Sequence, residues 1–168
     1  MARLKVPHWL VAILWPALLF LVYAGLPAGL ADVGPRHGWR AGRPAPLNLL
    51  GLVLLVPGLL SLGWITYRHL ASSPKRIEVP QPAPEYLLTD GMYRWSRHPM
   101  YVAGITTWVG WAIYYGGLAV MAGALLFASA IAFIAVPYEE RALQARFGEA
   151  YSRYRASVPR WFGLPRSR

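Results

Sequence analysis

Four apolar stretches, separated by short polar segments, divide the chain. Val6–Ala31 and Leu47–Tyr67 hold no charged residue. Met100–Tyr115 ends at a Gly-Gly turn, and Leu118–Tyr138 ends at a pair of glutamates. As a helix the second stretch would span about 31 Å, close to the ~30 Å hydrocarbon core of a bilayer, whereas the third would span only about 24 Å. The pattern predicts an all-α, polytopic membrane protein with four transmembrane helices.

The last two apolar stretches predict a C-terminal helical hairpin with polar residues at its two ends. From His98 to Tyr138 the chain holds no Asp, Glu, Lys or Arg. Folding the hairpin would bring the segment before His98 close to Glu139 and Glu140. We therefore assign the functional core to residues 85–168. Residues 1–84, with two transmembrane helices and a Pro-rich cytoplasmic loop, have a supporting role.

The first apolar stretch permits two interpretations. Arg3 and Lys5 precede it, as basic residues precede the apolar core of a signal peptide. That core is about 7–15 residues long, shorter than the stretch found here. We favour a retained transmembrane helix, which we expect to bend at Pro16 because proline removes a helical hydrogen bond.

Composition supports a membrane protein. The chain is 56% hydrophobic and only 14% charged, against about 25% charged in soluble domains. The net charge of +10 suggests nucleic acid, but the arginines flank apolar stretches and do not line one soluble face, so no nucleic-acid partner is expected. The absence of Cys excludes disulfides and thiolate sites, and the four His residues lack metal-ligand spacing.

The basic residues also predict an orientation. With four spans, 14 Lys and Arg residues lie on the side of the two termini and 3 on the opposite side. Basic residues concentrate on the cytoplasmic side of membrane proteins. We therefore expect both termini in the cytoplasm, and the protein in the cytoplasmic membrane of a bacterium or archaeon.

Glu139 and Glu140 directly follow the fourth apolar stretch. They could simply mark where the chain leaves the membrane, although exits on the cytoplasmic side favour Lys and Arg. Neighbours on a helix point about 100° apart, so one carboxylate could face the protein interior and the other the surface. Carboxylates kept close to lipid are costly and are often functional.

Arg97-His98-Pro99, before the third stretch, is equally ambiguous. It could be a basic anchor at the membrane surface, followed by a helix-starting proline. Next to two carboxylates, Arg97 and His98 could instead help to bind a zwitterion, with cations on its carboxylate and glutamate on its ammonium.

The tail carries an apolar stripe at helical spacing, formed by Leu143, Phe147, Tyr151, Tyr154 and Val158. We interpret it as a cytoplasmic interfacial helix, broken near Gly148 and bound to anionic headgroups. Tyr151 and Tyr154 could also close a pocket.

Two sequence blocks resemble a known family. They are Gly91-x-Tyr93-x-x-x-Arg97-His98-Pro99-x-Tyr101-x-x-Gly104 and Glu139-Glu140-x-x-Leu143-x-x-x-Phe147-Gly148-x-x-Tyr151-x-x-Tyr154-x-x-x-Val158-Pro159-Arg160. In order and separation they resemble the isoprenylcysteine carboxyl methyltransferases, which share a broader superfamily with phospholipid N-methyltransferases. The resemblance covers residues 85–160. It implies an integral membrane methyltransferase that uses S-adenosyl-L-methionine without a Rossmann domain.

The resemblance also implies the residues of the site. In the family the methyl donor lies at the cytoplasmic face, between the loop before the hairpin and the helix after it. Carried over by position, the cofactor-binding residues are Tyr86, Leu87, Leu88, Tyr93, His98, Pro99, Tyr101 and Glu139. Arg97 is expected to hold the acceptor, and Glu140 is a candidate base; no metal is implied.

One departure from the family leaves the acceptor open. In the eukaryotic prenylcysteine enzymes we expect an Arg one turn before the paired glutamates, placed for the substrate carboxylate, but Ala135 stands there. A neutral or amine-bearing lipophilic acceptor, entering from the bilayer between the third and fourth helices, is equally compatible, and membrane lipids are the other expected partners. The alternatives are an NADPH-dependent reductase resembling the sterol reductases and a non-catalytic membrane subunit.

Overall fold

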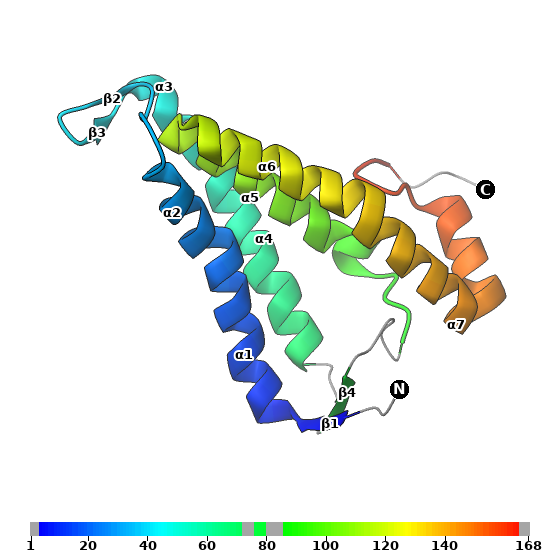
Figure 1. Cartoon of the computed structure of the whole chain (residues 1–168). Coiled ribbons are helices and arrows are strands. Elements are labelled where there is room, and N and C mark those ends of the chain that lie inside the picture. Colours follow the sequence, from blue (N-terminus) through cyan, green and yellow to red (C-terminus); the bar gives the residue numbers. More distant parts are fainter. Residues whose placement is uncertain (1–3, 72–75, 80–85, 165–168) are drawn as a thin grey trace. The chain divides into compact units, whose positions relative to one another are not determined.

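The computed structural model describes residues 4–71, 76–79 and 86–164, and this part of the chain is mostly helical (Figure 1). Two of its helical segments, η1 and η3, are π-helical turns, and η2 is a 3-10 turn. The helical segments are α1 (His8–Phe20), η1 (Leu21–Gly25), α2 (Leu26–Ala31), α3 (Pro46–Leu49), α4 (Gly51–Ala71), η2 (Gly91–Arg94), α5 (Pro99–Tyr115), α6 (Leu118–Ala130), η3 (Ile131–Ala135) and α7 (Val136–Ser157).

Within the described ranges, three helices are long and apolar enough to cross a membrane: His8–Ala31, Pro46–Ala71 and Leu118–Ser157. They contain the second and fourth predicted spans and all of the first except Val6 and Pro7. The third predicted span, α5, is a helix of 17 residues, shorter than the about 20 residues that a crossing takes. The four-span topology therefore stays a prediction.

Two short antiparallel ladders depart from the predicted all-α class. β1 (Leu4–Pro7) pairs with β4 (Arg76–Val79), and β2 (Trp39–Arg40) pairs with β3 (Arg43–Pro44). Each strand has four or two residues, too few to show the alternation by which strands are identified in a sequence. Residues 72–75 and 80–85, which belong to the predicted Pro-rich loop, lie outside the described residues.

A proline follows each of the two π-helical turns. Proline lacks an N–H, so the carbonyl four residues earlier loses its helical partner. For Pro27 this is the carbonyl of Tyr23 in η1, which accepts a hydrogen bond of 2.6 Å from the indole N–H of Trp111. The irregular turn therefore lies at Leu21–Gly25, and Pro16 lies inside α1, where a bend stays a prediction.

This hydrogen bond predicts that Trp111→Phe lowers the stability of the protein. The Tyr23 carbonyl would lose its partner while most of the apolar ring remains, which should cost about 1 kcal/mol. Thermal unfolding in detergent checks the effect, with the exposed Trp64 mutated to Phe as the control. Equal unfolding midpoints for the two variants would contradict this role of Trp111.

The chain divides into two compact units, and the first comprises Met1–Val79 and Ala103–Ala128. In this unit α4 and α5 approach each other at the level of their backbones. A Cβ placed on Gly51 would lie 2.5 Å from the carbonyl oxygen of Gly110, and one on Gly110 would lie 2.8 Å from the backbone nitrogen of Leu55. Small residues permit such close approach of membrane helices.

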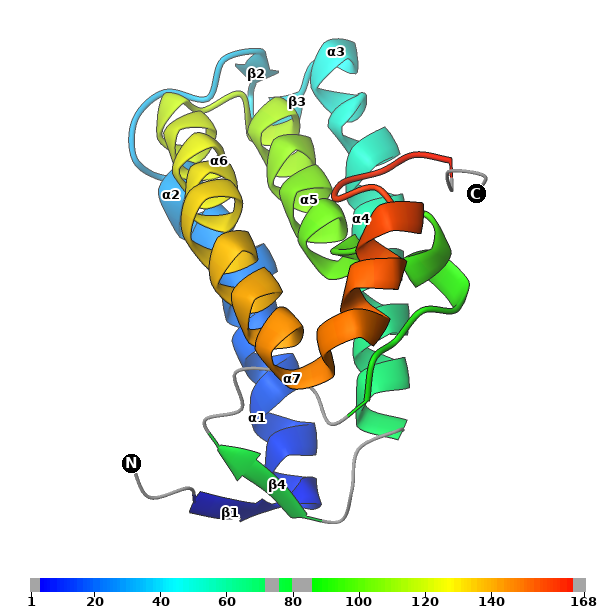
Figure 2. The ribbon, with the colours of Figure 1, turned by 90° about the vertical axis from the view of Figure 1, so that its right-hand side faces the viewer.

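The second unit comprises Pro80–Val102 and Ser129–Arg168. It contains both ends of the predicted hairpin, whereas the middle of the hairpin, Ala103–Ala128, belongs to the first unit. The functional division predicted between residues 84 and 85 stays a prediction. Figure 2 shows the feature that shapes the second unit, a sharp reversal of the chain within α7.

Candidate active site

The reversal in α7 occurs at Gly148. This residue has φ +50° and ψ −119°, a backbone conformation that side chains with a Cβ rarely adopt. The two arms of α7, residues 136–147 and 149–157, therefore fold back on each other (Figures 1 and 2). In a continuous helix, residues 140 and 160 would lie about 30 Å apart; in this unit Arg160 returns to contact Glu140.

The apolar stripe predicted in the tail is confirmed, and it packs within its own unit. Leu143, Tyr151, Tyr154 and Val158 are buried together in one cluster, and Leu87, Tyr93, Ala142 and Phe147 pack against it. The stripe is therefore covered by its own unit, because the turn at Gly148 brings the two arms together. Binding of this helix to lipid headgroups stays a prediction.

Glu140 is the centre of a buried charge cluster. Its side chain is 8% exposed and that of Arg97 is 9% exposed. Oε1 of Glu140 accepts a 2.6 Å hydrogen bond from Nη1 of Arg97, and Oε2 accepts one of 2.6 Å from Nη2 of Arg160. Nε of Arg160 donates to Oε1 at 3.1 Å. One carboxylate therefore holds two guanidinium groups, which come from the loop before α5 and from the end of the chain beyond α7.

His98 lies between the two glutamates. Its side chain is only 1% exposed; Nε2 is 3.3 Å from Oε1 of Glu140, and Nδ1 is 3.5 Å from Oε2 of Glu139. The Tyr101 ring stacks on the imidazole, with ring centroids 5.6 Å apart. The backbone N–H of His98 donates to Oγ of Ser96 at 3.0 Å, which fixes the chain where α5 begins. The imidazole is thus held on several sides and has little freedom to rotate.

Two titratable groups of this unit, Arg160 and Tyr93, have pKa values that their surroundings raise. The hydrogen bond to Glu140 raises the pKa of the Arg160 guanidinium, so this group stays charged throughout the physiological range. Burial, and next the negative charge of Glu139, raise the pKa of the Tyr93 phenol, so this group stays protonated. The cluster therefore presents fixed cations, together with a phenol that can donate a hydrogen bond.

The structure brings half of the predicted site residues together. Arg97, His98, Tyr101, Glu139 and Glu140 are joined by the contacts above. As predicted, one glutamate points inward and the other outward, since the Glu139 side chain is 32% exposed against 8% for Glu140. Arg97 and His98 contact carboxylates of the protein itself, and their binding of a zwitterionic ligand stays a prediction.

The other five predicted residues lie in the same unit, where Tyr93 packs against the apolar stripe. Pro99 is buried at the first position of α5, Leu87 packs against the apolar stripe, and Tyr86 and Leu88 are half-buried in the loop before η2. Their contact with a cofactor stays a prediction. The predicted site did not include Arg160. Its position at the end of the second sequence block was the only feature of the sequence that pointed to a role in the site.

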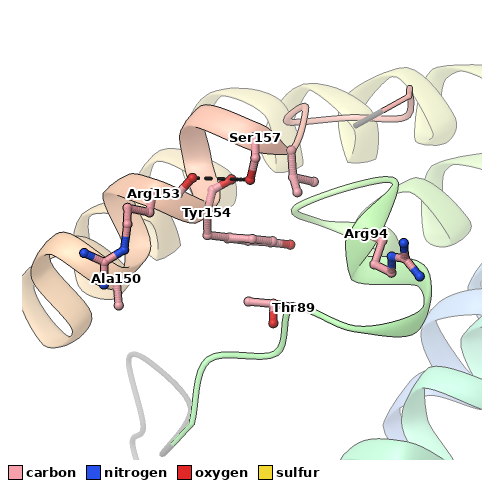
Figure 3. A pocket seen from close by; sticks show the side chains of 7 residues that line it. Thr89, Arg94, Ala150, Arg153, Tyr154 and Ser157 are labelled. Atoms are coloured by element: carbon pink, nitrogen blue, oxygen red, sulfur yellow. Dashed lines mark hydrogen bonds between the residues drawn. The ribbon is translucent and has the colours of Figure 1, made fainter. Parts of the chain in front are cut away.

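A pocket of about 360 Å³ lies in the same unit (Figure 3). In Figure 3 the Tyr154 ring extends above Thr89, with Arg94 and Arg153 at opposite ends. The pocket is lined by Thr89, Arg94, Ala150, Arg153, Tyr154, Ser157 and Val158. None of these residues belongs to the cluster around Glu140, so the pocket and the cluster are separate features of the unit.

Comparison with known proteins identifies the family. The sequence model of the phospholipid methyltransferase family matches residues 48–150, more than half of the chain. The chain belongs to the phospholipid methyltransferase family. The match extends from α3 to the second arm of α7, and so includes the cluster residues from Arg97 to Glu140.

A curated relative supports the same assignment. Protein-S-isoprenylcysteine O-methyltransferase B of Arabidopsis thaliana is 28% identical to this chain over 159 residues. The alignment covers 90% of this chain and 72% of the relative. The methyltransferase resemblance of the two sequence blocks is thus confirmed. The protein is a methyltransferase, and its long apolar helices are those of a membrane protein.

Proposed function

We propose that this protein is an integral membrane methyltransferase that uses S-adenosyl-L-methionine and methylates a lipophilic acceptor. The proposal extends the family assignment to one methyl donor and one class of acceptor. A single observation carries it: the imidazole of His98 is buried between the shielded carboxylate of Glu140 and the partly exposed carboxylate of Glu139. The same constellation supplies cationic, acidic and aromatic groups within one unit.

The residues fit the chemistry of this donor, which carries an ammonium, a carboxylate, a ribose and an adenine. Glu139 is the partly exposed carboxylate, suited to an ammonium or to ribose hydroxyls. The Arg97 guanidinium supplies positive charge for a carboxylate, and the half-buried rings of Tyr93 and Tyr101 supply aromatic surface. When bound, S-adenosyl-L-methionine would supply an activated methyl group on a sulfonium.

The protein's part in such a reaction is mainly to position groups and exclude water. His98 is fixed by Glu139, Glu140 and Tyr101, so it can hold a ligand group without reorganising. Glu140 accepts hydrogen bonds from two guanidinium groups, which makes it a weak proton acceptor. We therefore assign Glu140 a positioning role, and Glu139 remains the carboxylate available to a ligand.

The acceptor we propose is an apolar molecule that reaches the site from the bilayer. The span Leu118–Tyr138 holds no charged residue, and Ala135 stands where a carboxylate-binding Arg is expected. A neutral or amine-bearing acceptor is therefore as compatible as a carboxylate. The basic residues place both termini and the Glu140 cluster on the cytoplasmic side in this proposal.

Calorimetry on the detergent-purified protein tests the proposed donor. We expect S-adenosylhomocysteine to bind the wild type and to lose measurable binding in His98→Ala and Glu139→Ala, because each variant removes a polar group of the site. Glu149→Ala is the matched control, since Glu149 forms an exposed ion pair with Arg153. Binding of NADPH without binding of S-adenosylhomocysteine would refute the proposal and support a reductase.

A further inference from the structure

The chain after α7 forms a strap, which we define as Val158–Leu164, across the loop before α5. Arg97 donates its backbone N–H to the carbonyl of Pro159 at 3.0 Å, and Gly163 donates to the carbonyl of Trp95 at 3.0 Å. The rings of Phe162 and Trp95 stack with centroids 6.5 Å apart. The strap has no regular secondary structure, so its position depends on these contacts and on Arg160.

Arg160 connects the strap to the buried charge cluster. Its side chain is 42% exposed, whereas Arg97 and Glu140 are nearly enclosed. Within the part of the chain that the structure describes, Oε1 of Glu140 accepts hydrogen bonds from Arg97, His98 and Arg160, while Oε2 accepts only the bond from Arg160. Arg160 is therefore the group that fixes the rotation of this carboxylate.

The orientation of the carboxylate matters because the same group orients two other side chains. If Arg160 released Oε2, the carboxylate could turn, and the bonds of Oε1 to Arg97 and His98 would weaken together. Networks of this kind are coupled, so loss of one member affects the remaining bonds. Small misplacements of groups at a site have large effects on ligand binding and turnover.

We propose that Arg160 is a positioning residue, and that docking of the strap is required for Glu140 to present His98 and Arg97 to the ligands. This inference rests on the proposed function for the identity of the ligand, but the docking itself does not depend on it. In this arrangement Arg160 acts through Glu140 and does not itself contact a ligand.

Two measurements on Arg160→Ala test the proposal. Hydrogen–deuterium exchange of the full-length protein in detergent should show faster exchange at Trp95–His98 and in the strap, because the Arg97 N–H would lose its partner. The affinity for S-adenosylhomocysteine should fall by about tenfold or more, the equivalent of one charge-assisted hydrogen bond. Arg155→Ala, at an exposed Arg of the second arm of α7, should change neither measurement.

A double-mutant cycle separates positioning from direct contact. In the Glu140→Gln background, Arg160→Ala should cost little further affinity, because the charged partner is already gone. If Arg160→Ala retains its full effect there, Arg160 contacts the ligand and the positioning role is wrong. Unchanged exchange and unchanged affinity in Arg160→Ala would also overturn it. A wild type that does not bind S-adenosylhomocysteine would refute the proposed function, while the exchange measurement would still decide whether Arg160 docks the strap.

Discussion

Glu140→Ala is expected to lower the free energy of unfolding by about 3 kcal/mol, the scale on which removal of one partner from a buried ion pair destabilises proteins. The alanine would leave Arg97 and His98 buried without the carboxylate that binds both. Arg160 contributes less to this loss because its side chain is 42% exposed and can turn to solvent. Chemical unfolding in detergent micelles, followed by circular dichroism, measures the effect.

Two further variants make this result specific to the buried carboxylate. Glu140→Gln keeps the shape and one hydrogen-bond acceptor, so we expect a smaller loss than with alanine. Glu149→Ala removes a carboxylate from the same helix, but its pair with Arg153 is exposed, and such pairs contribute about 0–1 kcal/mol. If Glu140→Ala were no more destabilising than Glu149→Ala, the cluster would not be a stabilising centre of this unit.

Gly51→Ala is expected to destabilise the first unit by about 1–3 kcal/mol, the usual cost of overpacking. The added methyl group would lie 2.5 Å from the carbonyl oxygen of Gly110 and 2.6 Å from the backbone nitrogen of Tyr114. Both neighbours are backbone atoms of α5, so no side chain can move aside, and the two helices would have to separate. Thermal unfolding in detergent measures the loss.

Gly63→Ala is the matched control for this substitution. Gly63 lies in the same helix, α4, and a Cβ placed on it would have no neighbouring atom within 4 Å. The intrinsic helical preference for Ala over Gly, about 1 kcal/mol, acts in both variants, so the difference between them isolates the helix contact. A Gly51→Ala protein as stable as Gly63→Ala would show that α4 and α5 do not meet as closely as described.

Local pattern was sufficient for much of the fold. Apolar stretches of uncharged residues predicted the helices His8–Ala31 and Pro46–Ala71, and the Gly-Gly turn after Tyr115 correctly separated α5 from α6. Such predictions succeed because lipid requires each backbone polar group to bond within its own segment. Gly104 and Gly110 lie six positions apart on α5 and need not share one groove. In the structure Gly104 faces Tyr23, whereas Gly110 faces α4.

The candidate site was only partly predictable. Two sequence blocks identified Arg97, His98, Glu139 and Glu140, because these residues stand at the ends of one hairpin. Arg160 was not assigned, since its role depends on a contact twenty positions away along the chain. The residues of the apolar stripe were predictable but their packing partners were not, because a stripe of period 3.6 does not reveal whether lipid or protein covers it.

By itself, then, the sequence determined the helices, the methyltransferase family and the two polar ends of the hairpin, all of which follow from local periodicity and short motifs. Only the tertiary structure decided how the cluster is arranged. The left-handed conformation of Gly148 turns the second arm of α7 back on the first and returns Arg160 to Glu140. A glycine in a sequence permits such a turn, but the direction of the returning chain depends on packing between residues far apart in sequence.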